Sequence, residues 1–527
     1  MPLLDPIPRP HEPGFLDRFS SFSALLRRWN RERPDAPAVQ IGNTSLSWRW
    51  VLTSAEGIQS ALERCGVKPG DRVIVHLEDA PGLIASIAAI DEVRAVYVPV
   101  NVRLPDEQKA NICAISNAKF VLQGESASIG LPSCISVKPP PYDGLMLSTI
   151  SNTRQEIALP WRVGAGHRLE EDFAVATTSA TTAAAKAIVV NEFSVLATGY
   201  ALATALELGP DTAILPMVPL TSHLSLCCSI PASFLTGAPL LIPSSRRHIR
   251  GTLSWAIENR LTLLVGVPTN YLQLLQSFSN SCDPPLQGLR GIVAGSVCDE
   301  GVIRAVRNRL GMALCNHYGM SEIGGVSSVC LIDRDEELIY RSTGLPFPWV
   351  EARLHNDGTE PAELLIRGPG LFRSSLSNIP EMQKRVSPEG WLHTGDFGTI
   401  GPSGEIRICG RAGDMAIRCG NNIFFAEIEA VFRESDLVSD AVAFSLPDPI
   451  LGEAVCACIV LANGALPSAE DMFSFAAERL PSFKVPDFLT FRSQIETNLN
   501  GKVLRRTIQN EAKLGGLPLC SRKAVRM

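Results

Sequence analysis

Short apolar runs alternate with segments of helical periodicity between residues 70 and 320, and this alternation constrains the fold more than any other feature. The expected strands cover residues 72–76, 95–100, 120–122, 213–219, 237–242, 261–268, 291–294 and 313–319. Strands separated by helices predict a mainly parallel sheet covered on both faces. Ligands bind at the carboxyl ends of such strands, where Gly295 and Gly319 are expected to lie.

The rest of the chain predicts further units, because 527 residues are too many for one hydrophobic core. Residues 22–64 have a helical pattern, and residues 138–170 are expected to be a surface connection. We predict an α/β protein with a large N-terminal domain of parallel α/β sheets (1–411). This domain includes a small β-subdomain at about 340–411. It is followed by a small α+β C-terminal domain (412–527), which ends in a tail without predicted structure.

The composition excludes several classes of protein. A hydrophobic content of 45% with 19% charged residues is typical of a globular chain, and a net charge of −6 gives no reason to expect nucleic acid as a partner. The sequence shows no export signal and no window of about eighteen apolar residues that predicts a membrane span. The fourteen cysteines lack zinc or redox spacing. We therefore expect a reduced, cytoplasmic enzyme with buried cysteines.

A run of hydroxyl side chains, TTSATTAAAKA at residues 177–187, contains a single lysine, Lys186. It lies between two apolar segments, which favours a loop that joins two strands and faces an anion, because hydroxyls, amides and an ammonium all donate hydrogen bonds. A phosphate-binding loop normally contains glycine, and this run has none. The alternative is an alanine-rich helix, since alanine is the best helix former.

Five separated motifs carry a resemblance to a known family. They are YGMSE at 318–322, WLHTGD at 391–396, GRAGD at 410–414, GNNI at 420–423 with EIE at 427–429, and NGKVLR at 500–505. In this order the chain resembles the adenylate-forming superfamily of acyl-CoA synthetases, peptide-synthetase adenylation domains and beetle luciferases, and stand-alone acyl-CoA ligases most of all. The resemblance implies that a carboxylate is joined to AMP and then transferred to a thiol.

The resemblance implies roles for single residues. Ser321 would contact the α-phosphate, Glu322 would hold Mg²⁺, and Asp396 would accept hydrogen bonds from the ribose. Arg411 would reach the ribose or the phosphate. Donors, a cation and Mg²⁺ suit this chemistry because negative charge moves onto pyrophosphate. The other nucleotide-binding residues implied are Thr178, Ser179, Thr181, Thr182, Lys186, Gly295, Ser296, Val297 and Tyr318.

In this family the C-terminal unit is a mobile lid, which implies a second set of roles. Lys502 would bridge carboxylate and phosphate in an adenylating pose, and Gly420 would belong to the loop presented in a thioesterifying pose. The pivot aligns with Gly413, where glycine permits a wide range of φ and ψ. The plainer interpretation of Lys502 after Asn-Gly, and of Asp396 after Thr-Gly, is an ordinary turn.

The phosphate loop departs from the family pattern, TSGTTGxPKG. Ala180, Ala183 and Ala187 replace its three glycines, and Ala185 replaces its proline. If one of these positions needs a positive φ, alanine costs roughly 1–2 kcal/mol there, and the added methyl groups would displace the β- and γ-phosphates. The other departures are Phe425 and Glu496 in place of prolines and Arg94 in place of a glycine.

These departures lead to three hypotheses. The first is an acyl-CoA ligase with impaired adenylation, which thioesterifies a preformed acyl-AMP supplied by a separate adenylating enzyme. The second is a complete ATP-dependent ligase whose loop tolerates alanine, which Lys502 favours because thioesterification alone does not need it. The third is a catalytically weakened binding protein. The expected cofactors are acyl-AMP or ATP, Mg²⁺ and CoA.

The acyl pocket is expected to include Ser222, His223, Gly319 and Met320. The segment around Ser222 lacks an acidic residue for a substrate ammonium, so an amino acid is disfavoured and a hydrophobic or aromatic acid is favoured. His223 is either a gate to the pocket or an ordinary polar residue near a helix start. No carrier module follows the lid in this sequence, so free CoA is favoured over a separate acyl carrier protein.

Overall fold

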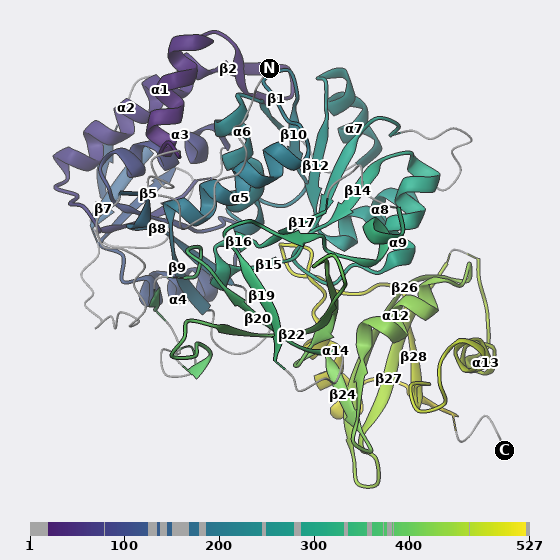
Figure 1. Ribbon diagram of the computed structural model, residues 1–527. Coiled ribbons are helices and arrows are strands. Elements are labelled where there is room, and N and C mark those ends of the chain that lie inside the picture. Colours follow the sequence, from purple (N-terminus) through teal and green to yellow (C-terminus); the bar gives the residue numbers. More distant parts are fainter. Residues whose placement is uncertain are drawn as a thin grey trace.

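The structure is a computed structural model. It describes residues 19–77, 80–124, 134–137, 145–149, 168–178, 186–244, 249–278, 286–330, 336–355, 361–372, 374–376, 382, 384–462 and 464–522. In these ranges no helix is both long enough and apolar enough to cross a membrane. Two large sheets, a smaller sheet and a C-terminal unit make up the molecule (Figure 1).

One large sheet has seven strands in the order β14-β13-β12-β10-β11-β1-β2. Its strands are β1 (Pro37–Ile41), β2 (Thr44–Ser47), β10 (Ile214–Pro216), β11 (Leu240–Ile242), β12 (Leu263–Gly266), β13 (Arg290–Val293) and β14 (Ala313–Asn316). Neighbours are parallel except in the β1–β2 hairpin. This hairpin corrects the helical pattern expected over residues 22–64. Its short strands are only partly buried, so they carry little apolar alternation.

The second large sheet has eight strands in the order β21-β9-β8-β4-β3-β5-β7-β6. The parallel strands are β3 (Arg72–His76), β4 (Val96–Pro99), β5 (Phe120–Gly124) and β8 (Asp172–Thr178). The antiparallel strands are β6 (Cys134–Val137), β7 (Leu145–Thr149), β9 (Lys186–Asn191) and β21 (Ser374–Ser375). The position of β7 beside β5 corrects the surface connection expected at 138–170. The α/β class with mainly parallel sheets is confirmed.

Helices cover the sheets and share one main core with them. They are α1 (Phe22–Glu32), α2 (Trp48–Arg64), α3 (Ala80–Glu92), α4 (Asp106–Ser116), α5 (Glu192–Ala205), α6 (Ile230–Thr236), α7 (Ile249–Glu258), α8 (Pro268–Ser277), α9 (Glu300–Ala305) and α10 (Glu336–Arg341). The core joins the buried rings of Phe22, Trp48, Phe193 and Phe234 to strand residues from both sheets. Both sheets therefore pack around the central helices α5 and α6 (Figure 1).

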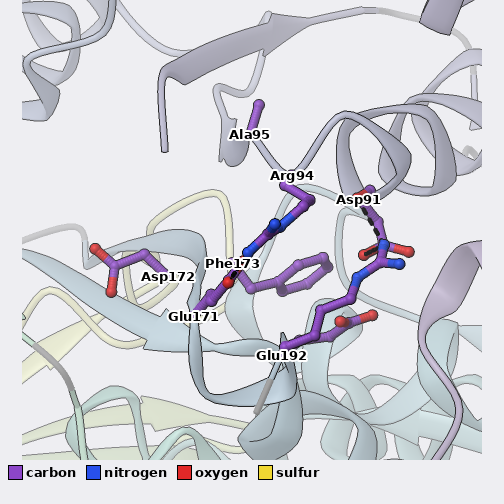
Figure 2. Close-up of a pocket in the computed structure, with 8 residues that line it drawn as sticks. Asp91, Arg94, Ala95, Glu171, Asp172, Phe173 and Glu192 are labelled. Atoms are coloured by element: carbon purple, nitrogen blue, oxygen red, sulfur yellow. Dashed lines mark hydrogen bonds and ion pairs between the residues drawn. The ribbon is translucent and has the colours of Figure 1, made fainter. Parts of the chain in front are cut away.

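The N-terminus of α1 is held by two buried carboxylates. Glu192 accepts a hydrogen bond from the Phe22 amide at 2.8 Å, and Asp91 accepts one from the Ser23 amide at 2.8 Å. Both carboxylates interact favourably with the positive end of the helix dipole. Burial, together with the charge of Asp91, raises the pKa of Glu192. The small polar cavity at this place, shown in Figure 2, serves the structure because internal hydrogen bonds already engage its charges.

The described residues also form two sheets of intermediate size and two small two-stranded sheets. A four-stranded antiparallel sheet contains β19 (Glu351–His355), β20 (Ala362–Arg367), β22 (Leu392–Ile400) and β23 (Ile406–Arg411). The C-terminal unit contains β24 (Met415–Arg418), β25 (Asn421–Phe424), α12 (Phe425–Arg433), β26 (Val438–Asp448), β27 (Gly452–Leu461), α13 (Ala469–Arg479), β28 (Phe488–Arg492), α14 (Arg505–Lys513) and β29 (Cys520–Ser521). The three elements after α13, namely β28, α14 and β29, replace the plain tail that the sequence suggested there. The chain changes sheet between Arg411 and Met415, and the predicted boundary at 411 stays a prediction.

Candidate active site

The hydroxyl-rich run joins two antiparallel strands, β8 and β9. Thr177 pairs with Ala187, and Thr178 pairs with Lys186, so the hairpin extends to both ends of the run. This arrangement agrees with a loop between two strands, and the alternative of a helix is wrong at these ends. The remaining predicted phosphate contacts, Ser179, Thr181 and Thr182, lie outside the described residues, together with Ala180 and Ala183.

A buried carboxylate, Asp396, lies at the centre of the predicted nucleotide site. The Tyr318 hydroxyl donates a hydrogen bond to its Oδ2 at 2.7 Å, and the Arg411 Nε lies 3.5 Å from its Oδ1. Asp396 on β22 and Arg411 on β23 are directly paired in the sheet. Burial raises the pKa of Asp396, while Arg411 and Tyr318 oppose this rise. Three predicted residues from separate motifs thus converge on one point.

A tight hairpin presents Ser321 and Glu322 next to Tyr318. The strands β15 (Gly319–Met320) and β16 (Gly325–Val326) pair in antiparallel fashion around the short 3₁₀ helix Ser321–Ile323. A Cβ atom on Gly319 would lie 2.1 Å from the Gly325 carbonyl oxygen, so only glycine fits there. Ser321 and Glu322 are buried. The hairpin fixes the backbone that carries both side chains.

Glu322 is held by an arginine that the sequence analysis did not single out. Arg385 Nη1 donates to Glu322 Oε1 at 2.7 Å. The same guanidinium donates from Nε to the His393 carbonyl at 3.0 Å and from Nη2 to the Thr394 carbonyl at 2.9 Å. Charge-assisted hydrogen bonds of this kind are roughly twice as strong as neutral ones. Arg385 is therefore a fixed cation in the candidate site.

Lys502 reaches the same site from the C-terminal unit. The Gly501 carbonyl accepts a hydrogen bond from the Thr269 hydroxyl at 2.9 Å, and a Cβ atom on Gly295 would lie 3.8 Å from Lys502 Cε. Lys502 as a whole is exposed to solvent. Desolvation of its ammonium and the charge of Arg411 lower its pKa, while Asp396 opposes this. The predicted catalytic lysine thus lies beside the predicted adenine segment.

The adenine segment itself follows β13. Gly295 has a φ of 89°, in the region that favours glycine, and Ser296 and Val297 are exposed after it. Next in the chain, Asp299 caps α9 by accepting a hydrogen bond from the Val302 amide at 2.9 Å. The segment therefore forms an open bend at the carboxyl end of a parallel strand, where α/β proteins bind ligands.

An ion pair joins the C-terminal unit to this bend. Arg433 on α12 donates to Asp299 Oδ2 at 2.9 Å, and both side chains are largely buried. Arg433 also binds Asp440 at 2.9 Å and the Ala441 carbonyl at 2.7 Å within its own unit. Figure 1 places α12 next to α9. Together with the Thr269–Gly501 bond, this pair docks the C-terminal unit in the pose that presents Lys502.

The predicted acyl-pocket residues Ser222 and His223 precede a π-helical turn, Ser225–Ser229. His223 is half-buried, and its Nε2 lies 3.3 Å from the Cys227 thiol, which donates to the Gly324 carbonyl at 3.1 Å. Desolvation lowers the pKa of His223 to about 4, with Glu322 opposing the shift. The imidazole is therefore neutral at physiological pH and close to the Ser321–Glu322 hairpin. Met320, in β15, is half-buried.

The two lid glycines differ in conformation. Gly420 has a φ of 81° in the turn between β24 and β25, and an added Cβ would meet nothing within 4 Å. Gly413, the predicted pivot, does not have a positive φ and also has open space around its Cα. Neither glycine is required by packing in this pose. Their roles in lid movement stay predictions.

Cysteine and metal-ligand patterns add two findings. Eight of the described cysteines are buried, namely Cys113, Cys227, Cys228, Cys298, Cys315, Cys330, Cys456 and Cys458, so the expectation of small buried hydrophobic residues holds for most of them. Over the described part of the chain, no group of three or more His, Cys, Asp or Glu side chains is arranged to hold a metal ion. Glu322 is thus the sole protein ligand that the resemblance offers Mg²⁺.

Comparison with known proteins gives the family. The family described as AMP-binding enzyme matches residues 26–376. The chain belongs to the AMP-binding enzyme family. Residues 427–502 match the AMP-binding enzyme C-terminal domain. The resemblance of this AMP-binding enzyme to the adenylate-forming superfamily is therefore confirmed over most of its length.

Several relatives of this AMP-binding enzyme are named as CoA ligases. It is 25% identical over 522 residues to a 3-[(3aS,4S,7aS)-7a-methyl-1,5-dioxo-octahydro-1H-inden-4-yl]propanoyl:CoA ligase of Rhodococcus jostii, covering 93% of this chain and 98% of the relative. It is 27% identical over 471 residues to a crotonobetaine/carnitine–CoA ligase of Escherichia coli, covering 84% and 89%. These relatives support acyl-CoA ligase activity for this enzyme.

Solved structures share the fold. An o-succinylbenzoate CoA synthetase from Bacillus subtilis, in complex with its acyl-adenylate intermediate, aligns with a TM-score of 0.76 at 19% identity, covering 92% of this chain and 97% of that one. An anthranilate CoA ligase in complex with anthranoyl-AMP aligns with a TM-score of 0.79 at 19% identity, covering 94% and 98%. Both support a large N-terminal domain with a small C-terminal one.

Sequence reasoning missed three features of the site. Arg385, the Arg433–Asp299 pair and the Cys227 thiol have no motif of their own, and each acts through a partner far along the chain. Arg385 and Glu322, for example, are 63 positions apart. Only the three-dimensional structure brings such pairs together.

Proposed function

We propose that this AMP-binding enzyme is an acyl-CoA ligase that transfers an acyl group from an acyl-adenylate to CoA and is impaired in making that adenylate from ATP. The observation that carries this proposal is an asymmetry. The Tyr318, Asp396 and Arg411 cluster is assembled, whereas the loop expected to hold the β- and γ-phosphates has alanine at all three glycine positions. Losing one well-aimed donor costs about two to three powers of ten in rate.

The charges of the described site support the same proposal. Three cations, Arg385, Arg411 and Lys502, face two carboxylates, Glu322 and Asp396. The nearby Asp414 is already paired with Arg505. The surplus of one positive charge matches the single negative charge of an acyl-adenylate phosphodiester. The additional negative charges of ATP would have to be neutralised by the phosphate loop at residues 177–187.

Each residue then has a task in the transfer of the acyl group. Asp396 would accept hydrogen bonds from the ribose hydroxyls, while Tyr318 holds the Asp396 carboxylate in place. Arg411 would neutralise the charge of the phosphate. The CoA thiolate forms a bond to the acyl carbon, the carbon–oxygen bond to the phosphate breaks, and AMP leaves. The thiol proton passes to solvent.

The acid is proposed to be hydrophobic or aromatic. His223 is neutral at physiological pH, and the two apolar residues predicted near the pocket, Leu224 and Met320, are half-buried. A neutral, partly apolar wall suits an uncharged acyl group and disfavours an amino acid. The bicyclic acyl group in the name of the Rhodococcus jostii relative is of the same kind. Free CoA is the proposed acceptor.

A complete ATP-dependent ligase remains the second candidate because one observation favours it. Lys502 lies beside Gly295, in the pose that the family uses for adenylation. A docked lysine would contribute directly to joining carboxylate and phosphate. The two candidates differ in the first half-reaction only, so separate measurements of each half-reaction distinguish them.

The test compares two rates over a panel of hydrophobic and aromatic acids. We expect formation of acyl-CoA from synthetic acyl-AMP and CoA, and acid-dependent release of pyrophosphate from ATP that is about 100-fold slower. The variant with Ala180→Gly, Ala183→Gly and Ala187→Gly should raise pyrophosphate release and leave thiolysis unchanged. Asp396→Asn serves as the control that lowers both.

Fast pyrophosphate release by the unmodified enzyme would replace this proposal with the complete ligase. Absence of both reactions, with retained binding of acyl-AMP, would indicate the third candidate, a binding protein derived from a ligase. The measured rates thus assign one of the three functions.

A further inference from the structure

The ion pair between Arg385 and Glu322 bears directly on the metal site that the family implies. Glu322 Oε1 accepts its hydrogen bond from Arg385 Nη1 at 2.7 Å, and only 6% of the Glu322 side chain is exposed. A guanidinium stays protonated at every relevant pH. The charge of this carboxylate is therefore compensated by the protein itself.

Arg385 is locked in place on three sides. Its Nε and Nη2 donate to the carbonyls of His393 and Thr394, which are consecutive residues of β22. Its backbone carbonyl accepts a hydrogen bond from the His393 amide at 2.7 Å, beside the bridge between Val386 and Leu392. The guanidinium cannot turn away from Glu322 without also breaking its hydrogen bonds to these two carbonyls of β22, which costs free energy.

Mg²⁺ would have to compete with this arrangement. The ion needs nearly ideal octahedral oxygen ligands at 2.0–2.1 Å and is usually held by one or two carboxylates together with substrate phosphates. Here the one carboxylate that the resemblance offers already binds a cation, and the residues described in the structure provide no cluster of further ligands. The residues present do not fit a metal ion at Glu322.

We propose that Arg385 is the resident counter-cation of Glu322 and keeps divalent metal ions from this carboxylate. The inference deepens the proposed function and rests on it in one respect, because a fixed cation suits the small charge of an acyl-adenylate better than the large charge of ATP. Arg385 is thus a positioning residue. It holds Glu322 and fixes the charge of the site without contributing a metal site.

The test is a double-mutant cycle that measures binding of Mn²⁺, a paramagnetic substitute for Mg²⁺. Affinity is determined by electron paramagnetic resonance with the full chain and a non-hydrolysable ATP analogue. In the unmodified protein, Glu322→Gln should change Mn²⁺ affinity less than twofold. In the Arg385→Gln background, Glu322→Gln should lower it by about tenfold or more, because the carboxylate has become available.

Arg385→Lys is the matched control. It keeps the positive charge next to Glu322, so Glu322→Gln should again have little effect in that background. Thermal melts by circular dichroism identify any variant that fails to fold. If Arg385→Gln is one of these, Arg385→Met, which also removes the charge and keeps a long side chain, takes its place in the cycle.

Two outcomes would overturn the inference. One is a tenfold effect of Glu322→Gln in the unmodified protein, because Glu322 would then bind the metal despite Arg385. The other is an equally small effect in all three backgrounds, because Arg385 would then not be what excludes the metal. Thiolysis of acyl-AMP is measured separately, so failure of the proposed function does not alter the conclusion from the cycle.

Discussion

Arg94 adopts a φ of 57° at the turn between α3 and β4. This is the position where the family pattern has glycine, and the left-handed region costs a side chain roughly 1–2 kcal/mol. The exposed ion pair between Arg94 and Glu171 recovers little, because exposed pairs contribute about 0–1 kcal/mol. Arg94 thus adopts a backbone conformation that glycine reaches without this steric cost.

We predict that Arg94→Gly has a free energy of unfolding about 1 kcal/mol higher than Arg94→Ala. Both variants lose the ion pair with Glu171, and only glycine relieves the left-handed strain. Urea denaturation of the two variants measures the difference. Equal stability would show that the turn relaxes around alanine.

Single site residues were predictable when they belonged to a motif and not otherwise. Tyr318, Asp396 and Arg411 come from three motifs, and the structure joins them through one carboxylate. Arg385 has no comparable signal, since its importance depends on a contact with Glu322 and on two carbonyls of β22. Local patterns report which residue types are present, while long-range ion pairs depend on how the chain folds back.

At the scale of elements, the β24–β25 hairpin has an unusual turn. Its two central residues, Cys419 and Gly420, have φ values of 49° and 81°. Positive φ at both positions defines a type I′ turn, for which Asn-Gly is the preferred sequence. Cys419 is exposed and therefore loses no packing when it is replaced.

We predict that Cys419→Asn stabilises the C-terminal unit by a few tenths of a kcal/mol to about 1 kcal/mol, because asparagine tolerates the left-handed region. Gly420→Ala should destabilise it by roughly 1–2 kcal/mol for the opposite reason. Amide hydrogen exchange of β24 and β25 measures both effects in the full chain. Faster exchange in Cys419→Asn than in the unmodified protein would contradict the assignment of the turn.

Elements were predictable in proportion to how much local signal they carry. The helix α13 begins with a strong local signal, because Ser468 and Asp471 form a capping box at its start. The strands β1 and β2 were missed because they are short and partly exposed. The helix α14 was missed because it is strongly polar, with only Ile508 and Ala512 buried. Its position depends on packing against β26, which a local pattern does not contain.

At the scale of the whole molecule, the ion pair between Arg433 and Asp299 holds the C-terminal unit in the pose that places Lys502 in the site. Arg433 retains Asp440 and the Ala441 carbonyl as partners when it leaves Asp299. Its charge therefore stays compensated in either pose. This makes the pair suitable as a releasable latch between two arrangements of the lid.

We predict that Asp299→Asn releases this latch. Asparagine keeps the N-cap of α9 and removes the charge that binds Arg433. A hydrogen bond between charged groups contributes about 1.5 kcal/mol, so the equilibrium should move roughly tenfold away from the docked pose. Thiolysis of acyl-AMP should then become faster, and amide exchange near Thr269 and Gly501 should increase.

The exposed Asp436 on the same unit provides the control, Asp436→Asn, which removes the same charge without touching Arg433. If both variants exchange at the rate of the unmodified protein, the lid is held by its other contacts and the Arg433–Asp299 pair is not the latch.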